Sequence, residues 1–93
     1  MRRRAKVDSN HAEIVRALRQ AGASVQSLAE IGDGCPDILV GIAGKNFTLE
    51  IKDGNLPPSK QRLSADELTW HKLWRGQVRV VTSVSEALAI LEE

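Results

Sequence analysis

The stretch Phe47-Thr48-Leu49-Glu50-Ile51-Lys52-Asp53-Gly54 alternates apolar and polar residues and ends at an Asp-Gly pair. Side chains two positions apart on a β-strand project from the same face, so the alternation predicts a strand with one buried and one polar face. Thr48, Glu50 and Lys52 share the polar face. The predicted strand therefore sets a carboxylate beside an ammonium group, which is either an ordinary charged surface or part of a site.

A second strand is predicted just before this one. The run Asp37-Ile38-Leu39-Val40-Gly41-Ile42 is almost entirely apolar, which predicts a strand covered on both faces. The turn Ala43-Gly44-Lys45-Asn46 would join the two strands as a hairpin. In that hairpin Asp37 begins one strand where Lys52 ends the other, so we expect Asp37, Glu50 and Lys52 to lie within reach of one another.

Helices and further strands are expected around the hairpin. The expected helices span about 10–21, 64–75 and 83–91, and the additional strands span about 24–30 and 78–81. Residues 55–63 contain Pro57-Pro58 and several basic residues, which predicts an exposed loop without regular structure. The order αβββαβα predicts a single α/β domain that spans residues 1–93.

The helix starts carry recognisable capping signals. Asn10 and Glu13 have capping-box spacing at the first helix, and Ser64 and Glu67 have it at the second. The second helix also carries an apolar stripe, made of Leu68, Trp70, Leu73 and Trp74. Its two tryptophans lie one helical turn apart, which favours a core or dimer contact over a platform for stacked bases.

Length, charge and cysteine content limit the class of protein. A chain of 93 residues supports one small hydrophobic core, so self-association is plausible. The formal net charge is +1, but residues 1–8 form a basic N-terminal arm suited to a polyanion or simply to solvent. The single cysteine, Cys35, excludes an intrachain disulfide framework and favours a reducing, cytoplasmic location. The sequence has no apolar run of membrane-spanning length.

Asp37, Glu50 and Lys52 together have a chemical meaning that none has alone. Two carboxylates with room for water suit a hard divalent cation such as Mg²⁺, which prefers oxygen ligands and retains several waters. Such an ion polarises phosphate oxygens, and a nearby ammonium can orient the attacking water. An isolated Glu-x-Lys pair is commonly surface decoration, so the prediction depends on Asp37 and on the order of the elements.

These residues resemble a known family. The segment Gly34-Cys35-Pro36-Asp37-Ile38-Leu39-Val40-Gly41, followed after a turn by Glu50-Ile51-Lys52, is similar to the signature of the PD-(D/E)XK nucleases. The similarity extends to the stand-alone VRR-NUC domains of phage and bacteria through the Pro-Pro-Ser-Lys loop, Leu63-Ser64-Ala65-Asp66-Glu67 and Trp74-Arg75-Gly76. It implies a restriction-endonuclease-like αβββαβ core with a mixed central sheet and a C-terminal helix.

The resemblance also implies roles for individual residues. Asp37 and Glu50 would be ligands of Mg²⁺ or Mn²⁺, the backbone carbonyl of Ile51 a further ligand, and Lys52 the catalytic lysine. The first helix often adds an acid in this family, and Glu13 holds the matching position, with the capping box as its rival explanation. Family members often have Gln where this chain has Glu67, which leaves the role of Glu67 open.

The activity implied is hydrolysis of DNA phosphodiester bonds by an endonuclease, selective for branched structures such as Holliday junctions. The resemblance also implies a homodimer, located in the cytoplasm of a bacterial or phage-infected cell. Four basic residues would contact the nucleic acid: Lys60, Arg62, Lys72 and Arg75. For Lys72 and Arg75 the alternative is a solvated helix face. A non-catalytic nucleic-acid-binding or assembly module that keeps the fold is the alternative function.

Overall fold

A computed structural model describes residues 9–93 of the protein, so the predicted basic arm 1–8 lies outside the described residues. The helices are α1 (His11–Gln20), α2 (Ala65–Leu73) and α3 (Val84–Ile90), with a short 3₁₀ helix η1 (Pro58–Lys60). The strands are β1 (Ser24–Ser27), β2 (Ile38–Ile42), β3 (Lys45–Ile51) and β4 (Val78–Val81). The predicted order of elements is confirmed. No helix of the described part is long and apolar enough to cross a membrane.

The four strands form one mixed sheet in the order β1-β2-β3-β4. β1, β2 and β3 pair antiparallel, whereas β4 runs parallel to β3. The predicted hairpin is confirmed: Ile42 pairs with Lys45, and the two residues between them, Ala43 and Gly44, have φ angles of 52° and 77°. Two positive φ angles define the type I′ turn, whose twist matches that of the strands it connects.

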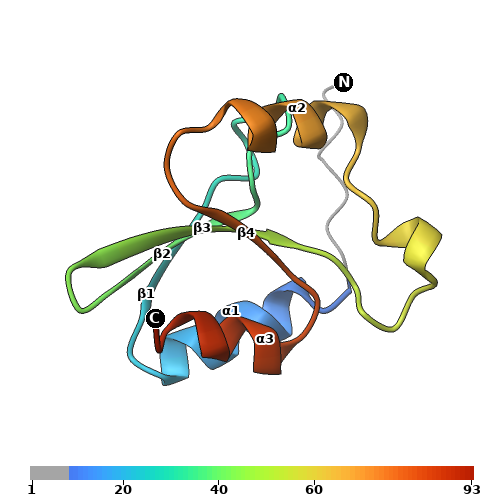
Figure 1. Ribbon diagram of the computed structural model, residues 1–93. Coiled ribbons are helices and arrows are strands. Elements are labelled where there is room, and N and C mark those ends of the chain that lie inside the picture. Colours follow the sequence, from blue (N-terminus) through green and yellow to red (C-terminus); the bar gives the residue numbers. More distant parts are fainter. Residues whose placement is uncertain (1–8) are drawn as a thin grey trace.

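The hydrophobic core lies between one face of the sheet and the pair α1 and α3, which run beneath it in Figure 1. The apolar side of β3 enters this core as predicted, because Phe47, Leu49 and Ile51 are all buried. The prediction that β2 is covered on both faces is wrong. Ile38 and Val40 are buried, but Leu39, which points to the opposite face of the sheet, is only half-buried. Helix α2 lies over that opposite face and has no buried residue, so it covers the face only loosely.

Helix α2 begins as predicted but packs differently. Ser64 and Glu67 form the expected capping box. The apolar stripe does not enter the core, because the side chains of Leu73 and Trp74 are 74% and 49% exposed. Trp74 instead stacks on Trp70, with ring centroids 4.5 Å apart. Of the two predicted roles, core or dimer contact, the core role is therefore wrong, and the dimer contact stays a prediction.

The first turn of α2 rests directly on the loop that leads into β2. Gly34 has a φ angle of 84°, and a Cβ atom added there would lie 2.2 Å from the backbone oxygen of Asp66. Only glycine tolerates both this backbone conformation and this approach. Gly34 therefore allows α2 to lie close to the loop that leads into the start of β2.

Two local predictions need correction. The Asn10 side chain does not cap α1; it donates to the carbonyls of Lys52 and Thr82, each at 3.1 Å. These carbonyls follow β3 and β4, so Asn10 ties the start of α1 to the ends of both strands. The loop after β3 is not wholly irregular, since η1 forms at Pro58, whose fixed φ suits the first residue of a helical turn.

Candidate active site

The candidate site lies where β2 begins and β3 ends. Ile38 pairs with Leu49 in the antiparallel register, which sets Asp37 opposite Glu50. The Oδ2 atom of Asp37 accepts a 2.6 Å hydrogen bond from the backbone N–H of Ile51, so its carboxylate reaches across to β3. The hairpin therefore positions the two acids through its register.

Glu50 is buried, although it lies on the face predicted to be polar. Its side chain is 4% exposed, and its Oε2 atom lies 3.7 Å from the Nζ atom of Lys52. Its second oxygen, Oε1, is buried and has no hydrogen-bond partner among residues 9–93. A buried carboxylate oxygen without a partner is costly, so the environment of Glu50 is not explained by folding alone.

Glu67 joins the site from α2, which the sequence did not reveal. Its Oε1 atom accepts hydrogen bonds of 2.8 Å from the Lys52 ammonium and 2.8 Å from the backbone N–H of Ser64. The capping box thus aims this carboxylate at the end of β3. The available signal was the third-position acid of the capping box, but the sequence could not show which element lay beneath it.

His71 follows Glu67 by one helical turn, so the two share a face of α2. The Nε2 atom of His71 is buried without a hydrogen-bond partner among the described residues. Burial lowers the pKa of the imidazole, with the charge of Glu67 raising it and that of Lys52 lowering it. The neutral ring is thus part of the environment of Lys52 and Glu67.

The environments of Glu50 and Glu67 shift the pKa values of these two carboxyl groups in opposite directions. The pKa of Glu50 is raised to about 9, first by burial and then by the charges of Asp37 and Glu67, while the Lys52 ammonium acts to lower it. Burial also acts to raise the pKa of Glu67, but hydrogen bonds from Lys52 and Ser64 outweigh it and the pKa is lowered. Without an additional positive charge, Glu50 therefore holds a proton at neutral pH.

The donor set fits a divalent cation that keeps much of its hydration. No group of three His, Cys, Asp or Glu side chains among residues 9–93 has the arrangement of a metal cage. The unpartnered Oε1 of Glu50, with Asp37 opposite, offers oxygen ligands from two carboxylates. Mg²⁺ is commonly held by one or two carboxylates together with waters and substrate phosphate.

Other candidate residues have more peripheral positions. Glu13 is exposed on the first turn of α1 and makes no hydrogen bond or ion pair with any described residue. Asp33 is exposed with a φ angle of 56°, as expected of a turn residue. Burial raises the pKa of the half-buried Cys35 thiol, and the charges of Glu50 and Asp37 raise it further, which disfavours a nucleophilic thiolate.

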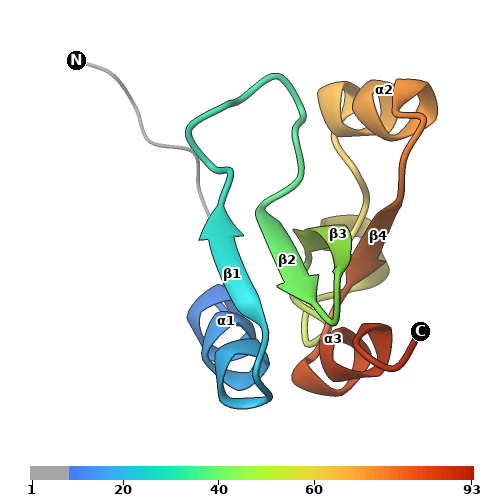
Figure 2. The same cartoon turned by 90° about the vertical axis from the view of Figure 1, so that its left-hand side faces the viewer.

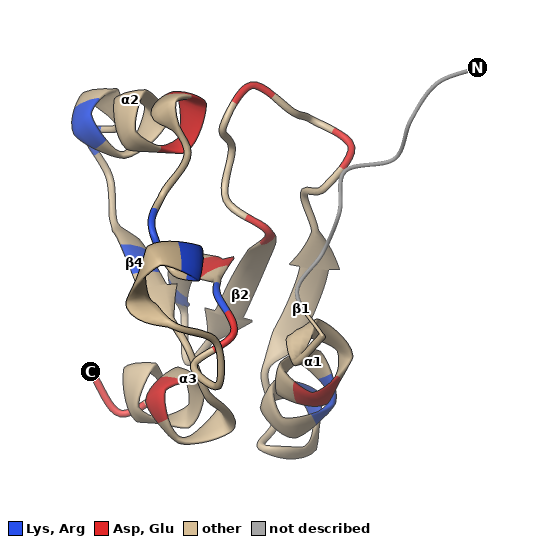
Figure 3. Ribbon diagram, turned by 90° about the vertical axis from the view of Figure 1, so that its right-hand side faces the viewer, with Lys and Arg blue, Asp and Glu red and all other residues tan. Residues whose placement is uncertain are grey.

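The predicted nucleic-acid-binding residues are all exposed: Lys60, Arg62, Lys72 and Arg75. Lys60 ends η1, and Lys72 lies in the last turn of α2. None of the four side chains forms an ion pair within the described part of the chain. Figure 3 shows basic positions at the end of α2 and on η1, and acidic positions in the β1–β2 segment and at the start of α2.

Comparison with known proteins yields a structural match. No family model matches the sequence, and a search of curated proteins finds no match. A solved structure described as a VRR_NUC domain is similar, with a TM-score of 0.66 and 24% sequence identity. The match covers 92% of this chain and 98% of that one. The resemblance inferred from the Glu50-Ile51-Lys52 segment is therefore confirmed for the architecture, and this chain has the fold of that VRR_NUC domain.

Proposed function

We propose that this protein is a metal-dependent DNA endonuclease that hydrolyses phosphodiester bonds. The observation that carries the proposal is the buried Glu50 carboxylate, which lies opposite Asp37 and has one oxygen without a partner among the described residues. Among residues 9–93, a single ammonium, that of Lys52, lies against Glu50 and Glu67. The excess of acid suits a bound cation, and the VRR_NUC fold makes a nuclease the fitting chemistry.

The proposed ligands of Mg²⁺ or Mn²⁺ are Asp37, Glu50 and the backbone carbonyl of Ile51. When bound, such an ion polarises a phosphate oxygen and lowers the pKa of a coordinated water. Glu13 remains the candidate for an additional acid from α1, and its exposed side chain would have to turn toward the strand ends.

Lys52 is the proposed catalytic lysine. Its ammonium is held by Glu67 at 2.8 Å and lies 3.7 Å from Glu50, so it is fixed at the mouth of the acid pair. There it can donate a hydrogen bond to the attacking water or to a phosphate oxygen and offset the charge that develops. Glu67 acts as a positioning residue, because it holds the ammonium through an oxygen that its own helix cap also fixes.

Basic residues beside the site support DNA as the substrate. Lys60 and Arg62 follow β3 closely, and Lys72 and Arg75 lie at the end of α2. Cationic side chains of this kind supply sequence-independent affinity for phosphates. No base-reading element is evident, so recognition by shape is proposed, with branched DNA such as a Holliday junction as the preferred substrate.

A cleavage assay tests this proposal. A four-way junction, a flap and a plain duplex are incubated with Mg²⁺ or Mn²⁺ and with wild-type, Lys52→Ala or Asp37→Ala protein. We expect metal-dependent cutting that favours the branched substrates and a strong loss in both variants. Cutting that is equal in all three proteins would refute the assigned residues. Binding without any cutting would favour the alternative, a non-catalytic nucleic-acid-binding module.

A homodimer is proposed as the active form. The apolar side chains of Leu68, Leu73 and Trp74 on α2 are 52%, 74% and 49% exposed. Exposed apolar groups gathered on one helix are characteristic of interaction surfaces. Light scattering should give a dimer mass for the wild type and a monomer mass for Leu73→Glu. A wild-type protein that stays monomeric at high concentration would contradict a paired cut of opposed strands.

A further inference from the structure

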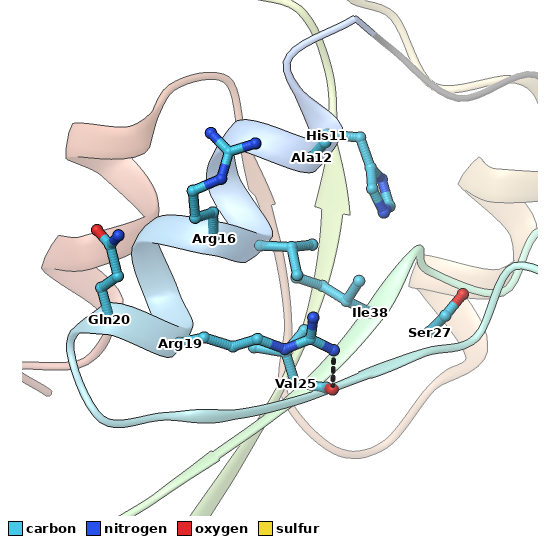
Figure 4. Close-up of a pocket in the computed structure, with 9 residues that line it drawn as sticks. His11, Ala12, Arg16, Arg19, Gln20, Val25, Ser27 and Ile38 are labelled. Atoms are coloured by element: carbon cyan, nitrogen blue, oxygen red, sulfur yellow. Dashed lines mark hydrogen bonds between the residues drawn. The ribbon is translucent and has the colours of Figure 1, made fainter.

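A groove runs between α1 and the strand β1, outside the candidate active site (Figure 4). β1 is an edge strand of the sheet, as Figure 2 shows, so no other strand of residues 9–93 pairs with its outer side. The groove encloses about 630 Å³ and is open to solvent. Its apolar lining comes from α1, β1 and β2, through the side chains of Ala12, Val15, Val25 and Ile38. The volume lies within the range of small-ligand pockets.

Two arginines give the groove a cationic wall. The Arg19 guanidinium donates a 3.0 Å hydrogen bond to the carbonyl of Val25, which fixes it across one end (Figure 4). Arg16 is exposed and forms no hydrogen bond or ion pair with any described residue, so its donors face solvent. None of the nine residues that line the groove is acidic. The nine lining residues therefore combine an apolar floor with two positive charges.

His11 adds a planar ring at the other end. Figure 4 shows its imidazole projecting from the start of α1 toward the side where Ser27 lies. Its Nδ1 atom is buried and lacks a hydrogen-bond partner among the described residues. The face of an imidazole ring suits a flat ligand such as a base.

Residues beside the groove are linked to the candidate active site along the chain and through one hydrogen bond. Ile38, which lines the groove, directly follows Asp37 in the chain. Asn10, which precedes His11, is hydrogen-bonded to the carbonyl of Lys52. Ile38 faces α1 and α3, whereas Glu50 faces away from them. A single strand of DNA that leaves the site would therefore pass over the ends of β2 and β3 to reach the groove.

We propose that this groove binds one unpaired nucleotide of a DNA substrate, with the base on the apolar floor beside His11 and the phosphate against Arg16. The proposal rests on the function proposed above, because it extends the substrate contact of the same domain. Apart from the His11 imidazole, no aromatic side chain lines the groove. It therefore suits a single nucleotide, since a run of stacked bases needs a row of aromatic side chains.

The test compares binding of a blunt duplex with binding of the same duplex that carries a short single-stranded tail. Fluorescence anisotropy is measured in EDTA, so that no metal-dependent cutting occurs. Ala12→Phe fills the groove from an exposed helix position, and Arg16→Ala removes the proposed phosphate contact. Lys45→Ala is the control, because it removes one positive charge at the β2–β3 hairpin, away from the groove. Thermal unfolding confirms that each variant is folded.

The wild type should bind the tailed duplex more tightly than the blunt one. Ala12→Phe and Arg16→Ala should each weaken tailed binding about tenfold, the expected effect of one charge-assisted contact, and should change blunt binding by about twofold at most. Arg16→Ala should also reduce the salt dependence of tailed binding by about one released counterion, which Arg16→Lys should restore. Lys45→Ala should not alter the preference for the tail.

Several results would overturn the proposal. A wild type that binds both duplexes equally, or an Ala12→Phe protein that keeps the full tail preference, would exclude the groove. A tail of abasic sites that binds as tightly as a normal tail would exclude the base contact. Cutting without tail preference overturns only the groove, and tail preference without cutting overturns only the proposed nuclease activity.

Discussion

Replacing Glu50 with glutamine should stabilise the metal-free protein while removing its affinity for metal. Glu50 is 4% exposed, and its pKa of about 9 in the folded state compares with an ordinary value of 4.5. At pH 7 the folded state therefore holds a proton that the unfolded chain has released. Because the folded pKa is the higher one, the contribution of Glu50 to stability is greatest below pH 4.5 and falls as the pH rises toward 9.

The size of the effect follows from the same two values. Holding the proton between pH 4.5 and pH 7 costs roughly 3 kcal/mol at 1.36 kcal/mol per pH unit. Glutamine has no such cost, although it gives up the 3.7 Å approach to the Lys52 ammonium. We therefore expect Glu50→Gln to gain about 2–3 kcal/mol at pH 7, which corresponds to roughly 10 °C or more in the melting temperature of a domain this small.

Urea and thermal unfolding in EDTA at a series of pH values measure this gain, and calorimetric titration with Mn²⁺ measures the affinity. The gain should vanish below pH 4.5 and increase up to about pH 9, and the heat of Mn²⁺ binding should disappear. The exposed Glu92→Gln is the matched control and should change stability by about 0.5 kcal/mol at most. A Glu50→Gln protein that is less stable at pH 7, or equally stabilised at pH 4 and pH 8, would refute the reasoning.

Three further substitutions test other parts of the structure. Gly34→Ala should destabilise the fold by at least about 1–3 kcal/mol, because its Cβ would lie 2.2 Å from the backbone oxygen of Asp66 and the residue has a positive φ. Urea unfolding measures this loss, and an unchanged midpoint would contradict the packing of α2 on Gly34. Asp53→Asn should lower the melting temperature at pH 7, and the difference should shrink as the pH falls below about 3.8. Hydrogen bonds from the backbone N–H of Asn55 and from the Ser9 hydroxyl lower the pKa of Asp53 below its ordinary 3.8, so the stability that they confer is lost as the pH falls through this lowered pKa. Glu67→Gln removes one of the charges that raise the pKa of Glu50, so calorimetry should show that Mn²⁺ binding begins at a lower pH; an unchanged pH profile would mean that Glu67 does not act on Glu50.

Patterns that are local in the sequence predicted their structure well. The alternation around Glu50 and the short turn before Lys45 specify a hairpin, and its register alone brings Asp37 opposite Glu50. Ser64 and Glu67 are three residues apart, so their capping box was also within reach of sequence reasoning. In each case the interacting groups are close in the chain or related by one pairing.

Partners that are distant in the chain could not be predicted in the same way. Asn10 has the spacing of a helix cap, yet its amide bonds to carbonyls 42 and 72 residues away. The stripe on α2 has the period of a buried face, but the helix rests on Gly34 through its first turn and leaves Leu73 exposed. Periodicity shows which residues share a face, and only the tertiary arrangement decides what that face meets.

The same distinction explains why the charge balance of the site emerged only from the structure. The hairpin alone contributes two carboxylates, from Asp37 and Glu50, and one ammonium, from Lys52. The capping box of α2 then adds a third carboxylate, Glu67, on the same ammonium. If all four groups were ionised, the cluster would carry an excess of two negative charges, and burial leaves Glu50 protonated instead. The divalent cation proposed above would bring the compensating charge, so the arrangement that weakens the metal-free fold is the one that would favour ionised Glu50 with the cation bound.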